Sequence, residues 1–163
     1  MAHDLALLNE CRALVRAVTP FATIEELHGS HAWRELGPRF DALLHNVRRY
    51  GVIGQPDEPR QSKSVRVVQW NIEHGNWFDQ VEHAFRTRAE LAAPDVITLD
   101  EVDLGCARAG NRDVTGDLAR ALNLHAAWAP LFLETTVGRD DDPVTAAGRE
   151  NEEGLFGIAV LSR

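Results

Sequence analysis

Residues 65–102 carry the strongest structural signal in the chain and read VRVVQWNIEHGNWFDQVEHAFRTRAELAAPDVITLDEV. The first eight of them, VRVVQWNI, are rich in β-branched and aromatic side chains, which predicts a strand buried on both faces. Residues 95–102, DVITLDEV, predict a second strand, and apolar residues at helical spacing from Asp79 to about Pro94 predict a helix between the two. A strand, a helix and a strand in succession form a crossover unit, so the two strands are expected to be parallel.

The sequence after this unit predicts one more helix and two more strands. The helix is expected from Asp113 to Leu122, and the strands at about 126–134 and at 155–162. An acidic, glycine-containing loop that includes the run Asp140–Asp142 joins these strands and is expected to be solvated. The two strands can pair in antiparallel fashion, which together with the parallel pair predicts a mixed sheet in an α/β fold.

The sequence before the crossover unit predicts a small helical appendage. An amphipathic helix is expected at 4–18, a short one at 23–27, and a third from Pro38 to Gly51. Residues 51–64, GVIGQPDEPRQSKS, contain prolines and glycines without a periodic apolar face, which is typical of a linker. The predicted organisation is therefore an appendage at 1–50, a linker at 51–64 and an α/β domain at 65–163.

Composition narrows the class of function. The chain has 163 residues, of which 44% are hydrophobic, and a net charge of −8. This charge gives no electrostatic basis for nonspecific binding to nucleic acid or anionic lipid, so a nucleic-acid substrate is possible but not favoured. Cys11 and Cys106 form no disulfide framework, and the first residues resemble neither a signal peptide nor a membrane span. We therefore predict a cytoplasmic location.

Polar residues gather where the two parallel strands are expected to end. Asn71 and Glu73 close the first strand, and Asp100, Glu101 and Asp103 close the second. In open α/β sheets this edge is where ligands bind, and oxygen ligands without cysteine suit Mg²⁺, Mn²⁺ or Ca²⁺. The alternative is that these strand ends are polar only because they emerge into solvent.

Four motifs add to this interpretation: WNIEHG at 70–75, LDEVD at 99–103, GNRDV at 110–114 and EEGLFGIAVLSR at 152–163. In this order they resemble the endonuclease/exonuclease/phosphatase superfamily, the deoxyribonuclease-like metal phosphoesterases, over residues 65–163. The resemblance implies a four-layered α/β sandwich, here in part, and attack of a metal-organised water on a phosphoester. It also implies a divalent cation as cofactor, Mg²⁺ or Mn²⁺.

The resemblance assigns roles to three residues. Glu101 corresponds to the family's metal-binding glutamate, and Asn71 to the asparagine that orients the scissile phosphate and the metal's ligands. Glu73, two positions after Asn71, would assist the metal. Arg112 and His74 are additional phosphate-binding candidates, because each lies in a loop expected near this site.

The sequence also departs from the family. Asp100 stands where the family commonly has glutamine, and Ile158 where it commonly has asparagine. The family's later motifs, including the one with the catalytic histidine, are not found before Arg163. We therefore expect the chain to be the amino-terminal portion of a longer protein, or a natural truncation, and to be inactive alone.

Three functions remain open from the sequence. The first is a divalent-metal-dependent phosphoester hydrolase, whether phosphodiesterase, nuclease or phosphatase. The second is a noncatalytic interaction module whose appendage at 1–50 docks to a partner protein. The third takes Glu73 and Glu101 as a glycosidase pair, which needs no metal and would therefore be insensitive to a chelator.

Overall fold

The computed structural model describes residues 4–51 and 64–163. The described part contains a mixed five-stranded sheet with the strand order β1-β4-β5-β3-β2. Its strands are β1 (Arg48–Tyr50), β2 (Val67–His74), β3 (Val96–Leu104), β4 (His125–Leu133) and β5 (Leu155–Ser162). The helices are α1 (Leu5–Val18), α2 (Ile24–Gly29), α3 (Trp33–Leu44), α4 (Phe78–Thr87), α5 (Val114–Leu122), α6 (Asp142–Ala146) and a short 3-10 helix, η1 (Ala107–Ala109).

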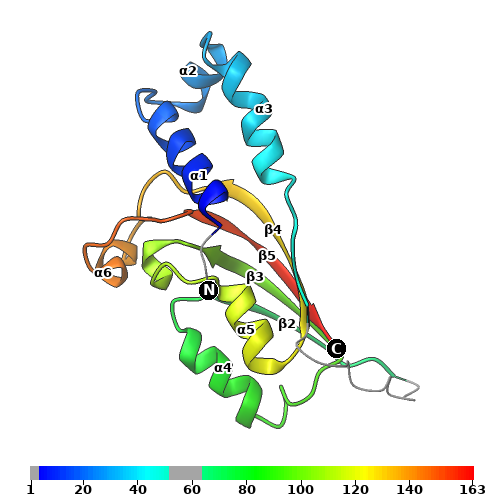
Figure 1. The fold of residues 1–163 in the computed structure, drawn as a ribbon. Coiled ribbons are helices and arrows are strands. Elements are labelled where there is room, and N and C mark those ends of the chain that lie inside the picture. The colour runs from blue at the N-terminus through cyan, green and yellow to red at the C-terminus, as the bar shows by residue number, and fades with distance from the viewer. Residues whose placement is uncertain (1–3, 52–63) are drawn as a thin grey trace.

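The crossover unit predicted at 65–102 is confirmed. β2 and β3 are parallel and in register from Val67 opposite Val96 to Asn71 opposite Asp100, with α4 between them in the chain. β5 pairs in antiparallel fashion with both β3 and β4, so the predicted mixed sheet and α/β class are also confirmed. Figure 1 shows α4 and α5 against one side of the sheet, with α1 to α3 forming an arm at one end of it.

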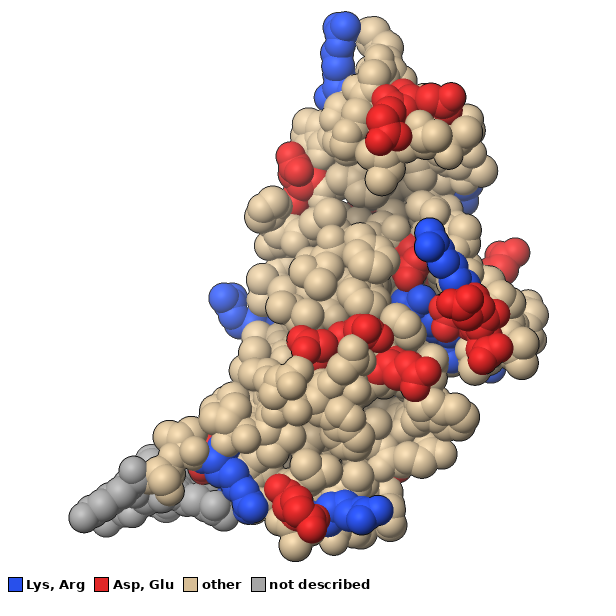
Figure 2. Space-filling model, turned by 180° about the vertical axis from the view of Figure 1, so that it is seen from behind, with Lys and Arg blue, Asp and Glu red and all other residues tan. Residues whose placement is uncertain are grey.

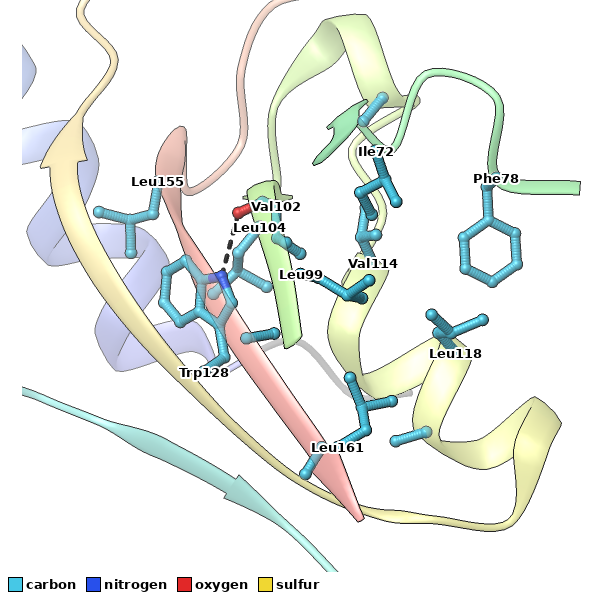
Figure 3. Close-up of a cluster of buried hydrophobic side chains, with 14 of the residues drawn as sticks. Ile72, Phe78, Leu99, Val102, Leu104, Val114, Leu118, Trp128, Leu155 and Leu161 are labelled. Atoms are coloured by element: carbon cyan, nitrogen blue, oxygen red, sulfur yellow. Dashed lines mark hydrogen bonds between the residues drawn. The ribbon is translucent and has the colours of Figure 1, made fainter. Parts of the chain in front are cut away.

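The core lies between the sheet and the helices that cover it (Figure 3). β3 contributes Ile97 and Leu99, and α5 contributes Val114 and Leu118, all of them at most 1% exposed. Trp128 of β4 is the largest fully buried side chain, and its indole N–H donates to the carbonyl oxygen of Val102 at 3.0 Å. Burial of the indole therefore leaves no polar atom of this ring unpaired.

The opposite face of the sheet keeps apolar side chains exposed. Ile158 and Val160 of β5 are 40% and 46% exposed, and Val67 of β2 is 58% exposed. The prediction that the first strand is buried on both faces is therefore wrong. β2 is an edge strand that pairs only with β3 in the described sheet, and the helices cover only one of its faces.

Two predicted helices and one predicted loop differ in the structure. α3 begins at Trp33, with Pro38 inside it, and ends at Leu44, because the chain then extends to pair β1 with β4. α4 ends at Thr87, well before Pro94, since Arg88 adopts an extended conformation. The loop between β4 and β5 contains α6, so it is not simply solvated. Residues 52–63 of the predicted linker lie outside the described residues.

Candidate functional site

Near their carboxyl ends, β2 and β3 both depart from regular strand pairing, and they do so at neighbouring positions. The register between them shifts between Asn71 and His74, and β3 shifts against β5 between Leu99 and Val102. Within these shifts Glu73, His74 and Glu101 have φ angles of 50°, 65° and 54°. This left-handed conformation costs non-glycine residues about 1–2 kcal/mol each. Such strain gathers at functional sites, which makes this end of the strand pair the candidate site.

The irregular segment fixes the orientation of Asn71. Its side-chain Oδ1 accepts a hydrogen bond of 3.0 Å from the backbone N–H of Glu73. The side chain is exposed, and its Nδ2 has no partner among the described residues. Asn71 is therefore held by its oxygen and presents two N–H donors to solvent, an arrangement that suits a phosphate oxygen.

His74 lies between two carboxylates contributed by β3. Its Nε2 is 3.7 Å from Oε2 of Glu101, and its Nδ1 is 3.8 Å from Oδ1 of Asp103. Nδ1 is buried and has no hydrogen-bond partner in the described part of the protein, and the ring packs against Phe156 with centroids 5.5 Å apart. The structure therefore brings together His74 and Glu101, which lie far apart in the sequence.

Asp103 is not available to a metal ion. Its side chain is fully buried, and both of its oxygens accept hydrogen bonds from Arg108, at 2.7 and 3.0 Å. Burial raises the pKa of this carboxyl, while the Arg108 guanidinium acts in the opposite direction. Glu101, in contrast, is 37% exposed. Asp103, one of the polar residues expected at this sheet edge, is therefore paired with Arg108 inside the protein rather than open to a ligand.

Arg108 forms ion pairs with more than one carboxylate that is partly or fully buried. Besides Asp103 it pairs with Glu134 at 2.8 Å and with Asp142 at 3.2 Å, and only 4% of its side chain is exposed. The predicted solvated acidic loop thus contributes a partly buried ion pair through Asp142. No sequence motif indicated Arg108. The one available signal was that a buried aspartate in a strand needs a nearby cation.

Acidic side chains also lie on the face of the sheet that the helices do not cover. Figure 2 shows a row of them across a surface that is otherwise largely without charge. Asp100 lies on this face opposite Asn71 and accepts a hydrogen bond from the side-chain amide of Gln69. This hydrogen bond gives the carboxylate of Asp100 a partner, at a position where the family that the sequence resembles commonly has glutamine.

The donor set fits a cation that takes few protein ligands. Among residues 4–51 and 64–163, no three histidine, cysteine or acidic side chains converge closely enough to enclose a metal ion. Glu101 and Glu73 nevertheless offer carboxylate oxygens beside the strained strand ends, without an arginine or lysine paired to them in the described part of the chain. Mg²⁺ typically uses one or two carboxylates and fills its remaining positions with water and substrate oxygens.

Arg112 does not join this group. Its guanidinium stacks over the ring of Phe78, with Cζ 4.2 Å from the centroid, and its Nη1 is 3.3 Å from Asp117. It lines a separate cavity beside the amino end of α4. Of the candidates from the sequence, the structure therefore brings His74 beside Glu101, with Asn71 and Glu73 just before His74 at the end of β2, and places Arg112 elsewhere.

Comparison with protein-family models, curated proteins and solved structures finds no match to this chain. Among the described residues, no helix has the length and apolar character required to cross a membrane.

Proposed function

We propose that this chain contributes the metal-binding and phosphate-binding residues of a divalent-metal-dependent phosphoester hydrolase. One observation carries the proposal: the strained ends of β2 and β3 bring His74 beside Glu101, and Asn71 and Glu73 lie just before His74 at the same end of β2. Strained backbone persists only where the surrounding structure supports it, and it is concentrated at functional positions. An amide donor beside exposed carboxylates is the combination that a phosphoester and a hard cation require.

The proposed roles follow from the environment of each side chain. Glu101, with Glu73, would hold Mg²⁺ or Mn²⁺, which when bound neutralises charge that develops on the phosphoryl oxygens. Asn71 donates from Nδ2 to a phosphate oxygen, because its Oδ1 is already occupied by the Glu73 N–H. The Nε2 of His74 is 3.7 Å from the carboxylate of Glu101, and its Nδ1 is 3.8 Å from the buried Asp103. The substrate is a phosphoester, and the charge of −8 favours one other than bulk nucleic acid.

Metal binding is the direct test of this proposal. Calorimetric titration with Mn²⁺ and Mg²⁺ is expected to show one site in the wild-type chain, absent in Glu101→Gln. Glu90→Gln is the matched control, because Glu90 is exposed and has no ion pair among the described residues. If Glu101→Gln binds Mn²⁺ as the wild type does, the assignment of Glu101 is refuted.

Turnover separates the proposal from the other two functions. In a longer protein that also carries the family's later motifs, hydrolysis of bis-nitrophenyl phosphate that requires Mn²⁺ and stops on chelation supports the phosphoester hydrolase, whereas chelator-insensitive hydrolysis of a glycoside supports the glycosidase pair. The interaction module has one structural observation in its favour: Leu5 and Ile24 on the helical arm are 67% and 66% exposed. A chain that binds no metal and hydrolyses neither substrate would favour that module.

A further inference from the structure

A second polar cavity lies on the helix-covered side of the protein, apart from the site at Glu101. It has a volume of about 310 Å³ and is bordered by the loop from Gly75 to Asn76, the first turn of α4, and the region from η1 to α6. Three arginines line it, Arg108, Arg112 and Arg149. In a chain with a net charge of −8, such a concentration of arginine at one cavity requires an explanation.

The three arginines differ in how many carboxylates already form ion pairs with them. Arg108 is neutralised by its buried acidic partners. Arg149 is exposed, and its Nη2 donates only to backbone carbonyls, those of Ala107 at 3.4 Å and Thr145 at 3.0 Å. No carboxylate of the described residues forms an ion pair with Arg149. Its positive charge is therefore available to a ligand.

Arg112 is held in a defined position at the same cavity. Its guanidinium lies over Phe78, and its pairing with Asp117 is long, at 3.3 Å, with 39% of the arginine side chain exposed. Stacking on an aromatic ring fixes the plane of a guanidinium and leaves its edge free for hydrogen bonds. Arg112 therefore presents donors to the cavity at little further cost in side-chain entropy.

Uncharged donors complete the lining. The backbone N–H groups of Asp79 and Gln80 lie in the first turn of α4, where no intrahelical acceptor exists, and no side chain caps this helix. The side chain of Asn76 also lines the cavity, and its Oδ1 is buried without a hydrogen-bond partner among the described residues. No hydrogen bond from the described part of the protein fixes this amide, so its Nδ2 can turn toward a ligand.

From the two arginines and these donors we propose that the cavity binds a phosphate group, either inorganic phosphate or the phosphate of a small phosphomonoester. Several donors that surround a space of this size call for a ligand with three or more acceptor oxygens, and a phosphate dianion supplies them. A single carboxylate would leave part of the donors unpaired. Asp79 is the one carboxylate that lines the cavity, and it opposes binding. This site does not depend on the proposed hydrolase function.

The test follows the backbone amide signals of the ¹⁵N-labelled chain during titration with inorganic phosphate, at constant ionic strength and with a chelator present. The chelator removes any contribution from a metal at Glu101. In the wild type, the signals of Asp79 and Gln80 are expected to shift to saturation. Arg149→Gln is expected to weaken binding about tenfold, as for loss of a charge-assisted hydrogen bond. Asp79→Asn is expected to strengthen binding several-fold.

Arg34→Gln is the matched control, because Arg34 is exposed on the helical arm, has no ion pair among the described residues and carries the same charge. It is expected to bind phosphate as the wild type does. The proposal is overturned if the Asp79 and Gln80 signals do not respond, if Arg34→Gln and Arg149→Gln weaken binding equally, or if acetate acts as well as phosphate. Tighter binding of glycerol 3-phosphate than of inorganic phosphate would identify a phosphomonoester as the ligand, and equal binding would identify free phosphate.

Discussion

Replacement of Arg108 by methionine tests the buried ion cluster that lies beneath the candidate site. The substitution keeps a long, unbranched side chain but removes the guanidinium that donates to both oxygens of Asp103. Removal of one partner of a buried ion pair costs about 3–5 kcal/mol, because the remaining charge is left uncompensated. This is a large part of the about 5–15 kcal/mol that stabilises a typical domain. With a urea m-value of about 2 kcal/mol/M, the unfolding midpoint would fall by about 2 M.

The sign of the pH dependence provides a second readout for Arg108→Met. Burial raises the pKa of Asp103, and without the guanidinium no nearby group opposes that shift as strongly. In the folded variant, Asp103 therefore stays protonated at pH values at which it has already lost its proton in the unfolded chain, where its pKa is about 3.9. The stability of the variant is retained below about pH 4 and lost as the pH rises through the raised pKa. The difference from the wild type should thus grow between about pH 4 and pH 7.

Two further variants make this prediction specific. Arg34→Met carries the same substitution at an exposed arginine and is expected to stay within about 0.5 kcal/mol of the wild type. The double variant Asp103→Asn, Arg108→Met removes the uncompensated charge and is expected to recover about 1–2 kcal/mol relative to Arg108→Met. Chemical denaturation followed by tryptophan fluorescence measures all of them. A loss below about 1 kcal/mol for Arg108→Met, or no recovery in the double variant, would refute the reasoning.

Two other predictions concern the site and the core. In a longer protein that also carries the family's later motifs, Asn71→Ala is expected to lower kcat for bis-nitrophenyl phosphate about a hundredfold, the effect of removing one positioned donor. The unfolding midpoint should change little because Asn71 is exposed, and an altered KM at unchanged kcat would contradict its role. Gly157→Ala is expected to cost about 2–3 kcal/mol in urea unfolding, because a Cβ there would lie 2.2 Å from the carbonyl oxygen of Ala129. Gly29→Ala, where a Cβ meets nothing within 4 Å, should leave the midpoint almost unchanged, and equal losses in both variants would contradict the packing argument.

The sequence predicted those elements whose pattern is local. The crossover unit, α5 and the last two strands all follow from short apolar runs in the sequence. β1 could not be predicted, because Arg48 and Arg49 have no strand pattern of their own. Their strand conformation arises from antiparallel pairing with β4, with Arg49 opposite Ala127. Such pairing depends on residues far away in the chain, which periodicity does not report.

The spacing of residues in the sequence also could not predict the environment of each polar residue at the strand ends. Spacing placed Asp103 and Glu101 at the same edge, two positions apart, and gave no means to distinguish their environments. The structure separates them: Asp103 is fully buried against Arg108, whereas Glu101 remains 37% exposed. The register shift between Leu99 and Val102 breaks the strict alternation of faces along β3, so spacing alone could not assign either side chain to a face.

The same register shifts give the strongest physical reason to regard the strand ends as a site. A regular continuation of β2 and β3 would have kept Glu73, His74 and Glu101 out of the left-handed region, where they now have positive φ angles. At about 1–2 kcal/mol each, the three residues together store roughly 3–6 kcal/mol of strain, comparable with the stability of a small domain. Of the three side chains, that of Glu73 is exposed and that of Glu101 is partly exposed, whereas the His74 ring packs against Phe156. The left-handed residues bring the His74 imidazole to 3.7 Å from the Glu101 carboxylate, at the strand end that also carries Asn71, and the proposed phosphoester chemistry would use this arrangement.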